Sequence, residues 1–66
     1  MNIQCNGKPR TLDQQATLHD LVLSLELDPQ SLVAEVNGKI IEHTGFAELS
    51  LSEGDRVELI RFVGGG

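Results

Sequence analysis

Hydrophobic and polar residues alternate at the start of the chain, with hydrophobic side chains at positions 1, 3 and 5 and polar ones at positions 2 and 4. A period of two predicts a strand with one buried face. Asn6-Gly7 comes next and suits the positive φ angles of a type I′ turn, so the chain should return as a hairpin through residues 8–13. Pro9 has no N–H to donate to a sheet, which places this second strand at an edge.

The pattern changes to a helical period after Thr17. Thr17, followed three residues later by Asp20, predicts a helix cap. Hydrophobic residues then recur at i, i+3, i+4 and i+7 and form one stripe that faces a core: Leu18, Leu21, Val22 and Leu25. The helix should end before Asp28-Pro29, because a residue ahead of proline is biased out of the helical region. We therefore expect a connecting loop over residues 27–31.

A second pair of strands is predicted in residues 32–41. Positions 32, 34 and 36 are hydrophobic and share one face. Asn37-Gly38 is a second turn of the same type and leads into a strand at 39–41. Residues 42–51 are less regular: we expect a short helical turn at 44–48, with Leu49 and Leu51 anchored in the core.

The last strand is predicted at 56–63, after a turn at 52–55, because it is dense in β-branched, aromatic and aliphatic residues. Strict alternation directs Val57 and Leu59 toward the helix and leaves Ile60 and Phe62 on the open face of the sheet. Two large hydrophobic side chains on an uncovered face are a candidate docking patch for a partner protein.

These elements predict an α+β fold in which a mixed sheet packs on one main helix. With the first and last strands side by side at the centre, this is the β-grasp, or ubiquitin-like, arrangement. The predicted domain covers residues 1–63, and residues 64–66 form a flexible glycine tail. We expect no second domain, because 66 residues support one small core.

The formal net charge of −5 disfavours nucleic acid or an anionic membrane and suits a protein partner with a basic face. Neither a secretory leader nor a stretch of transmembrane length is evident, so we expect a cytoplasmic protein that is monomeric when free. Cys5 alone cannot form an internal disulfide and is expected in the core. His19 and His43 have no triad or ligand spacing, so no catalytic residue and no metal site are predicted.

Gly64-Gly65-Gly66 follow the last strand directly. Glycine orders at high entropic cost, so we expect a mobile tail that carries a carboxylate about 10 Å beyond the last strand residue. A frayed end or a cloning remnant is the simplest alternative. However, at an average glycine usage of about 7%, three in a row at one site are expected roughly three times in ten thousand. A tail without side chains suits a carboxylate that enters a narrow channel in another protein.

Three segments in this order resemble the ThiS family, the sulfur carriers of thiazole formation in thiamin biosynthesis: Val36-Asn37-Gly38-Lys39-Ile40-Ile41, Ser52-Glu53-Gly54-Asp55-Arg56-Val57-Glu58-Leu59 and Arg61-Phe62-Val63-Gly64-Gly65-Gly66. The resemblance spans essentially the whole chain. The family's diglycine end is matched by Gly65-Gly66, and Gly64 extends it.

The resemblance implies a carrier rather than an enzyme. A ThiF-like adenylyltransferase would use ATP to adenylate the carboxylate of Gly66, and a sulfur-donating persulfide enzyme would convert the adenylate into a thiocarboxylate. A ThiG-like thiazole synthase would then take the sulfur. Gly64 and Gly65 would thread into the partner's active site. No bound cofactor is implied, only the C-terminal adenylate and thiocarboxylate as covalent states. Activation is needed because an α-carboxylate with a pKa near 3.5 is ionised and inert.

Two other functions remain open. The small subunit of molybdopterin synthase is a sulfur carrier with the same fold and tail, although this chain is short for that family. A ubiquitin-like binding module with an inert tail is the alternative from another class. Replacing the tail separates a module from a carrier, because a module would keep its partner affinity and a carrier would lose turnover.

Overall fold

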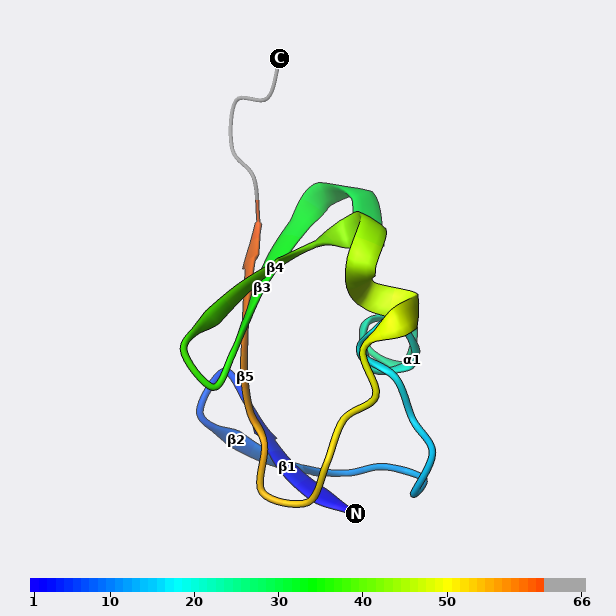
Figure 1. Cartoon of the computed structure of the whole chain (residues 1–66), viewed down its shortest axis with the longest axis vertical. Coiled ribbons are helices and arrows are strands. Elements are labelled where there is room, and N and C mark those ends of the chain that lie inside the picture. Colours follow the sequence, from blue (N-terminus) through cyan, green and yellow to red (C-terminus); the bar gives the residue numbers. More distant parts are fainter. Residues whose placement is uncertain (62–66) are drawn as a thin grey trace.

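The computed structural model describes residues 1–61, which form a five-stranded mixed sheet and one α-helix (Figure 1). The elements, in chain order, are β1 (Asn2–Cys5), β2 (Lys8–Thr11), α1 (Leu18–Ser24), the 3₁₀ helix η1 (Pro29–Ser31), β3 (Leu32–Val36), β4 (Lys39–Glu42), the 3₁₀ helix η2 (His43–Glu48) and β5 (Arg56–Arg61). Residues 62 and 63 of the predicted last strand, and the tail at 64–66, lie outside the described residues.

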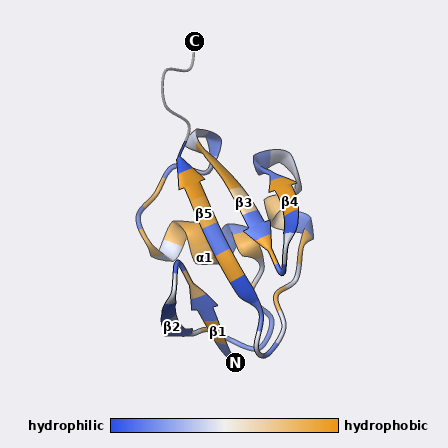
Figure 2. Ribbon diagram, turned by 90° about the vertical axis from the view of Figure 1, so that its left-hand side faces the viewer, coloured by the Kyte–Doolittle hydropathy of each residue, from blue (hydrophilic) through white to orange (hydrophobic). Residues whose placement is uncertain are grey.

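The strand order in the sheet is β2-β1-β5-β3-β4, so the first and last strands are neighbours at the centre. β1 and β5 are parallel, whereas β1–β2, β3–β4 and β3–β5 are antiparallel. Helix α1 lies on one side of the sheet, and the other side is open in Figure 2, where β5 crosses in front of the helix. This arrangement confirms the predicted α+β, β-grasp fold, and β2 with its Pro9 is an edge strand as expected.

Both Asn-Gly turns have the predicted backbone conformation. Asn6 and Gly7 have φ of 52° and 80°, and Asn37 and Gly38 have φ of 50° and 88°. Positive φ at both central residues defines a type I′ turn, whose twist matches that of the strands it connects. The two turns therefore fix the registers of the β1–β2 and β3–β4 hairpins.

The start of α1 is capped as predicted. The Asp20 N–H donates to the Thr17 hydroxyl at 3.1 Å, and the Thr17 N–H donates to the Asp20 carboxylate at 2.9 Å. The hydrogen bond from the Thr17 N–H, followed by a contribution from the Thr17 side chain, lowers the pKa of the Asp20 carboxyl. The helix ends at Ser24, earlier than the hydrophobic stripe suggested, because Leu25 caps it and Glu26 turns to a positive φ of 59°.

The loop expected at 27–31 is partly wrong, because Pro29–Ser31 form η1. The Asp28 carboxylate accepts a hydrogen bond from the Gln30 N–H at 3.0 Å, and the Ser31 N–H donates to the Asp28 carbonyl at 3.0 Å. Asp28 thus caps one helical turn that begins with proline, which tolerates the first position of a helix. A single turn of this kind leaves no periodic signal in the sequence.

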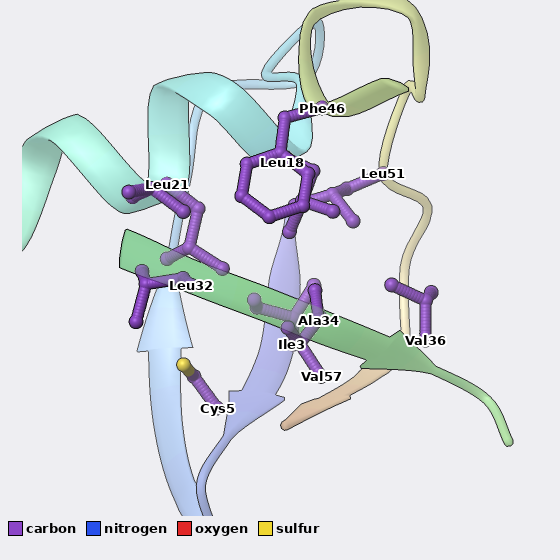
Figure 3. Close-up of a cluster of buried hydrophobic side chains, with 11 residues drawn as sticks. Ile3, Cys5, Leu18, Leu21, Leu32, Ala34, Val36, Phe46, Leu51 and Val57 are labelled. Carbon is purple, nitrogen blue, oxygen red and sulfur yellow. The ribbon is translucent and has the colours of Figure 1, made fainter. Parts of the chain in front are cut away.

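The core lies between the sheet and the layer formed by α1 and η2. Its buried hydrophobic residues are Ile3, Cys5, Leu18, Leu21, Val22, Leu32, Ala34, Val36, Phe46, Leu51 and Val57. Phe46 is fully buried, and Figure 3 shows its ring pointing from η2 toward Leu18 and Leu51. Leu51 anchors its stretch as predicted, and Leu49 packs more loosely against the same cluster. The sequence interpretation did not single out Phe46, although it is the largest fully buried side chain of residues 1–61.

Candidate functional site

The open face of the sheet presents a hydrophobic patch on three neighbouring strands, β5, β3 and β4. Ile60 and Ile40 are 50% and 56% exposed, and Val33 is partly buried between them. Val33 lies directly opposite Ile60 in the register, and Ile40 lies opposite Glu35. We call Val33, Ile40 and Ile60 the open-face patch. Figure 2 looks onto this side, where β5 alternates between hydrophobic and hydrophilic residues along its length.

The alternation predicted for the last strand is confirmed as far as Arg61. Val57 is fully buried, Leu59 packs against the core, and Ile60 is exposed on the opposite face. Ile60 is 50% exposed and shares its face with Ile40 and Val33, and a group of hydrophobic side chains on one open face is a candidate interaction site. Phe62, the other residue of the predicted docking patch, lies outside the described residues. The docking role itself stays a prediction.

Acidic side chains surround the open-face patch. Glu35 and Glu58 are cross-strand partners on β3 and β5, and Glu42 is the partner of Val33 on β4. Like charges directly opposite each other on a sheet are unfavourable for the free protein. Arg56 is the basic residue on this face of β5. The face therefore suits a partner surface that combines hydrophobic and basic side chains.

Both ends of β5 are held by the side chain of an asparagine from an Asn-Gly turn. Near the start, the Arg56 N–H donates to Asn37 Oδ1 at 2.9 Å, and Asn37 Nδ2 donates to Asp55 Oδ1 at 2.9 Å. Near the end, the Leu59 N–H donates to Asn6 Oδ1 at 2.8 Å. The sequence interpretation assigned both asparagines to turns and missed these contacts. No local signal reveals them, because Asn6 and Leu59 are 53 positions apart.

Cys5 is buried in the core as predicted, and burial raises the pKa of its thiol. A protonated, enclosed thiol is a poor nucleophile and metal ligand. Across residues 1–61, no group of three or more His, Cys, Asp and Glu side chains could hold a metal ion. His43 is exposed and His19 is partly exposed, on different elements. What the described residues present on the open side of the sheet is the open-face patch, whose docking role stays a prediction.

The predicted chemical site at Gly64, Gly65 and Gly66 lies outside the described residues. What the structure does place is the strand that leads to it: β5 is central, pairs with β3 up to Arg61 and presents the open-face patch on the way. Over the described part of the chain, no helix is long and apolar enough to cross a membrane.

The model of the ThiS family matches residues 3–66. The sulfur carrier protein ThiS of Bacillus subtilis (strain 168) is 34% identical over 65 residues, a match that covers 97% of this chain and 98% of that protein. The crystal structure of the thiamine biosynthesis protein ThiS from Geobacter metallireducens superimposes with a TM-score of 0.83 at 33% identity, over 100% of both chains.

A different kind of relative is a thiazole synthase of Magnetococcus marinus, which is 30% identical over 66 residues. The match covers this entire chain but 20% of that protein, and a thiazole synthase of Paramagnetospirillum magneticum gives the same proportion at 29% identity. The chain thus spans about a fifth of the length of these two relatives.

Proposed function

This chain belongs to the ThiS family, and on that premise we propose that it is a cytoplasmic sulfur carrier of thiamin biosynthesis whose working group is the carboxylate of Gly66. The observation that carries the proposal is the match over residues 3–66, which includes the glycine end as well as the β-grasp domain. The open-face patch lies on β5, the strand that leads to those glycines, and on its neighbours β3 and β4. A hydrophobic surface next to the glycine end supports a protein that docks on other enzymes and is modified by them.

The chemistry begins with activation of the carboxylate. An oxygen of the Gly66 carboxylate attacks the α-phosphorus of ATP in a ThiF-like adenylyltransferase, and pyrophosphate leaves. The acyl adenylate then has AMP as a leaving group, so the outer sulfur of an enzyme persulfide can attack the acyl carbon. A thiol next reduces the S–S bond of the acyl persulfide, which leaves the thiocarboxylate on Gly66 and a disulfide on the donor side.

The acceptor of the sulfur is a ThiG-like thiazole synthase. The two thiazole synthases that contain a segment similar to this chain support this choice, because a carrier and its acceptor act on the same atom. Transfer of the sulfur and hydrolysis return the carboxylate, so the carrier can be used again. The domain at 1–63 docks, and Gly64 and Gly65 pass through the partner's channel without widening the chain.

Adenylation tests this function directly. The purified chain, ATP and a ThiF-like enzyme should exchange radiolabelled pyrophosphate into ATP, and exchange should need both proteins. A molybdopterin-type carrier would be activated preferentially by the corresponding enzyme of that pathway. An inert binding module would bind the enzyme without exchange, and that outcome would contradict the proposal.

Ile60→Thr is expected to weaken binding to the activating enzyme by about 1–3 kcal/mol, as truncation of an interface anchor does. Threonine keeps the β-branched shape that a strand favours, so the melting temperature should change little. The same loss of affinity is expected for Phe62→Ala. Isothermal titration calorimetry with the activating enzyme measures the effect.

Leu23→Gln is the matched control for Ile60→Thr. Leu23 is 51% exposed, close to the 50% of Ile60, but it lies on α1, away from the open face. We expect wild-type affinity for Leu23→Gln. Equal losses in the two variants, or a large fall in melting temperature with unchanged affinity for Ile60→Thr, would argue against docking through the open face.

A further inference from the structure

β5 is paired with a neighbouring strand over a longer stretch on one edge than on the other. On one side, β3 pairs with β5 from Val57 through Arg61. On the other side, β1 pairs with Arg56 and Val57, and β1 then ends at Cys5. The last part of β5 described by the structure, which leads to the glycine end, thus extends past the strand that flanks its start.

Asn6, the residue after β1, makes the next hydrogen bonds to β5. Its N–H donates to the Val57 carbonyl at 2.9 Å, which continues the ladder by one residue. The chain then turns away at a φ of 52°, and the Asn6 Oδ1 accepts the Leu59 N–H at 2.8 Å. The side-chain amide therefore occupies the place of the backbone carbonyl that a longer β1 would supply. One residue makes two hydrogen bonds to β5, two and four positions before Arg61.

We propose that Asn6 is a positioning residue for the carboxylate of Gly66, which acts by keeping the end of β5 in its sheet register before the tail enters a partner. The inference rests on the proposed carrier function. The position of a reactive group at the end of a glycine tail depends on the position of the strand to which the tail is attached. Without the Asn6 amide, the last residues of β5 are held from the β3 side alone, and docking must then supply the missing order at a cost in affinity.

Asn37 provides a matched control within the same chain. It has the same residue type, the same turn and a φ of 50°, and its Oδ1 also accepts a backbone N–H of β5 at 2.9 Å. The bond is made to Arg56, at the opposite end of the strand from the glycines. Asn6→Gly and Asn37→Gly each keep the positive φ, which glycine adopts freely, and each remove one side-chain acceptor of a β5 N–H. Asn37→Gly also removes the hydrogen bond from Asn37 Nδ2 to Asp55. Asn6→Asp keeps an acceptor oxygen in the same place.

The experiment compares these three variants with the wild type in ATP–pyrophosphate exchange by the activating enzyme. For Asn6→Gly we expect a KM for the carrier roughly three- to tenfold higher, because docking must restore the order that the lost hydrogen bond provided. We expect kcat to stay unchanged, because the end of β5 is equally ordered in the docked variant and the docked wild type. Asn37→Gly should keep the wild-type KM although it loses two side-chain hydrogen bonds, to the Arg56 N–H and to Asp55, and Asn6→Asp should restore the wild-type KM. Amide hydrogen exchange should show faster exchange at Leu59 in Asn6→Gly and slower exchange again in Asn6→Asp.

The outcomes test the carrier function and the positioning role of Asn6 separately. If the wild-type protein supports no exchange with its activating enzyme, the proposed carrier function is wrong. Wild-type activity with equal KM values for Asn6→Gly and Asn37→Gly removes the positioning role alone and leaves Asn6 as a structural residue. Unchanged exchange of the Leu59 amide in Asn6→Gly would overturn the proposal independently of any enzyme.

Discussion

Deletion of Gly66 is expected to abolish ATP–pyrophosphate exchange by the activating enzyme and to leave the melting temperature unchanged. The shortened chain still ends in a carboxylate, but that carboxylate lies about 3.5 Å short of its position in the full-length chain. Misplacement of a reacting group by as little as about 1 Å can reduce a rate by roughly 10²-fold, so a whole residue should remove measurable exchange. Stability should persist because glycine has no side chain to pack, and the described core residues run from Ile3 to Val57.

Gly65→Phe tests the same tail without changing its length. The carboxylate keeps its reach, but a large side chain now stands where the partner's channel accepts only backbone. Exchange should again be lost with an unchanged melting temperature. Undiminished exchange by either tail variant would show that the activating enzyme does not use the carboxylate of Gly66.

Phe46→Ala should remove a large part of the protein's free energy of unfolding. A buried Phe→Ala change typically costs about 3–5 kcal/mol. A 66-residue domain has a free energy of unfolding of roughly 3–10 kcal/mol at the usual stability per residue. Phe46 is fully buried and comes from η2, so its loss also removes contacts that hold this irregular segment beside α1. Urea unfolding followed by circular dichroism measures the change.

Phe46→Leu is the matched variant, because leucine keeps most of the buried volume. It should fold and lose a smaller part of the stability, about 1–1.5 kcal/mol. A melting temperature of Phe46→Ala within a few degrees of the wild type would mean that η2 contributes little to the core, contrary to the burial of its aromatic ring.

The regular parts of the fold follow from local patterns. The period of two in residues 32–36 and the two Asn-Gly pairs give β3 and both hairpins, because alternation and positive φ are local properties. Thr17 and Asp20 mark the start of α1 for the same reason. The helix end and η1 are harder to predict, because the hydrogen bonds of Leu25 and Asp28 act within one turn and leave no periodicity in the sequence.

In the candidate site, too, some features follow from local sequence patterns and others do not. The exposure of Ile60 could be derived from alternation along one strand. The wider open-face patch could not, because Val33 and Ile40 join Ile60 only through the register of three strands. The contact between Asn6 and Leu59 is even harder to predict. It joins a turn near the start of the chain to a strand 53 positions later.

The measurement that tests the central claim most directly is the intact mass of the protein isolated from cells growing without thiamin. The account predicts a chain that ends at Gly66, accompanied by a form heavier by the difference between one sulfur and one oxygen atom. Peptide mapping should place the added mass on Gly64-Gly65-Gly66, and the heavier form should survive mild reductant and disappear on hydrolysis. A persulfide on Cys5 would instead add a whole sulfur atom and would be removed by reductant. If cells that grow without thiamin make thiazole but no sulfur is found on the tail of the protein, this result would contradict the sulfur-carrier function.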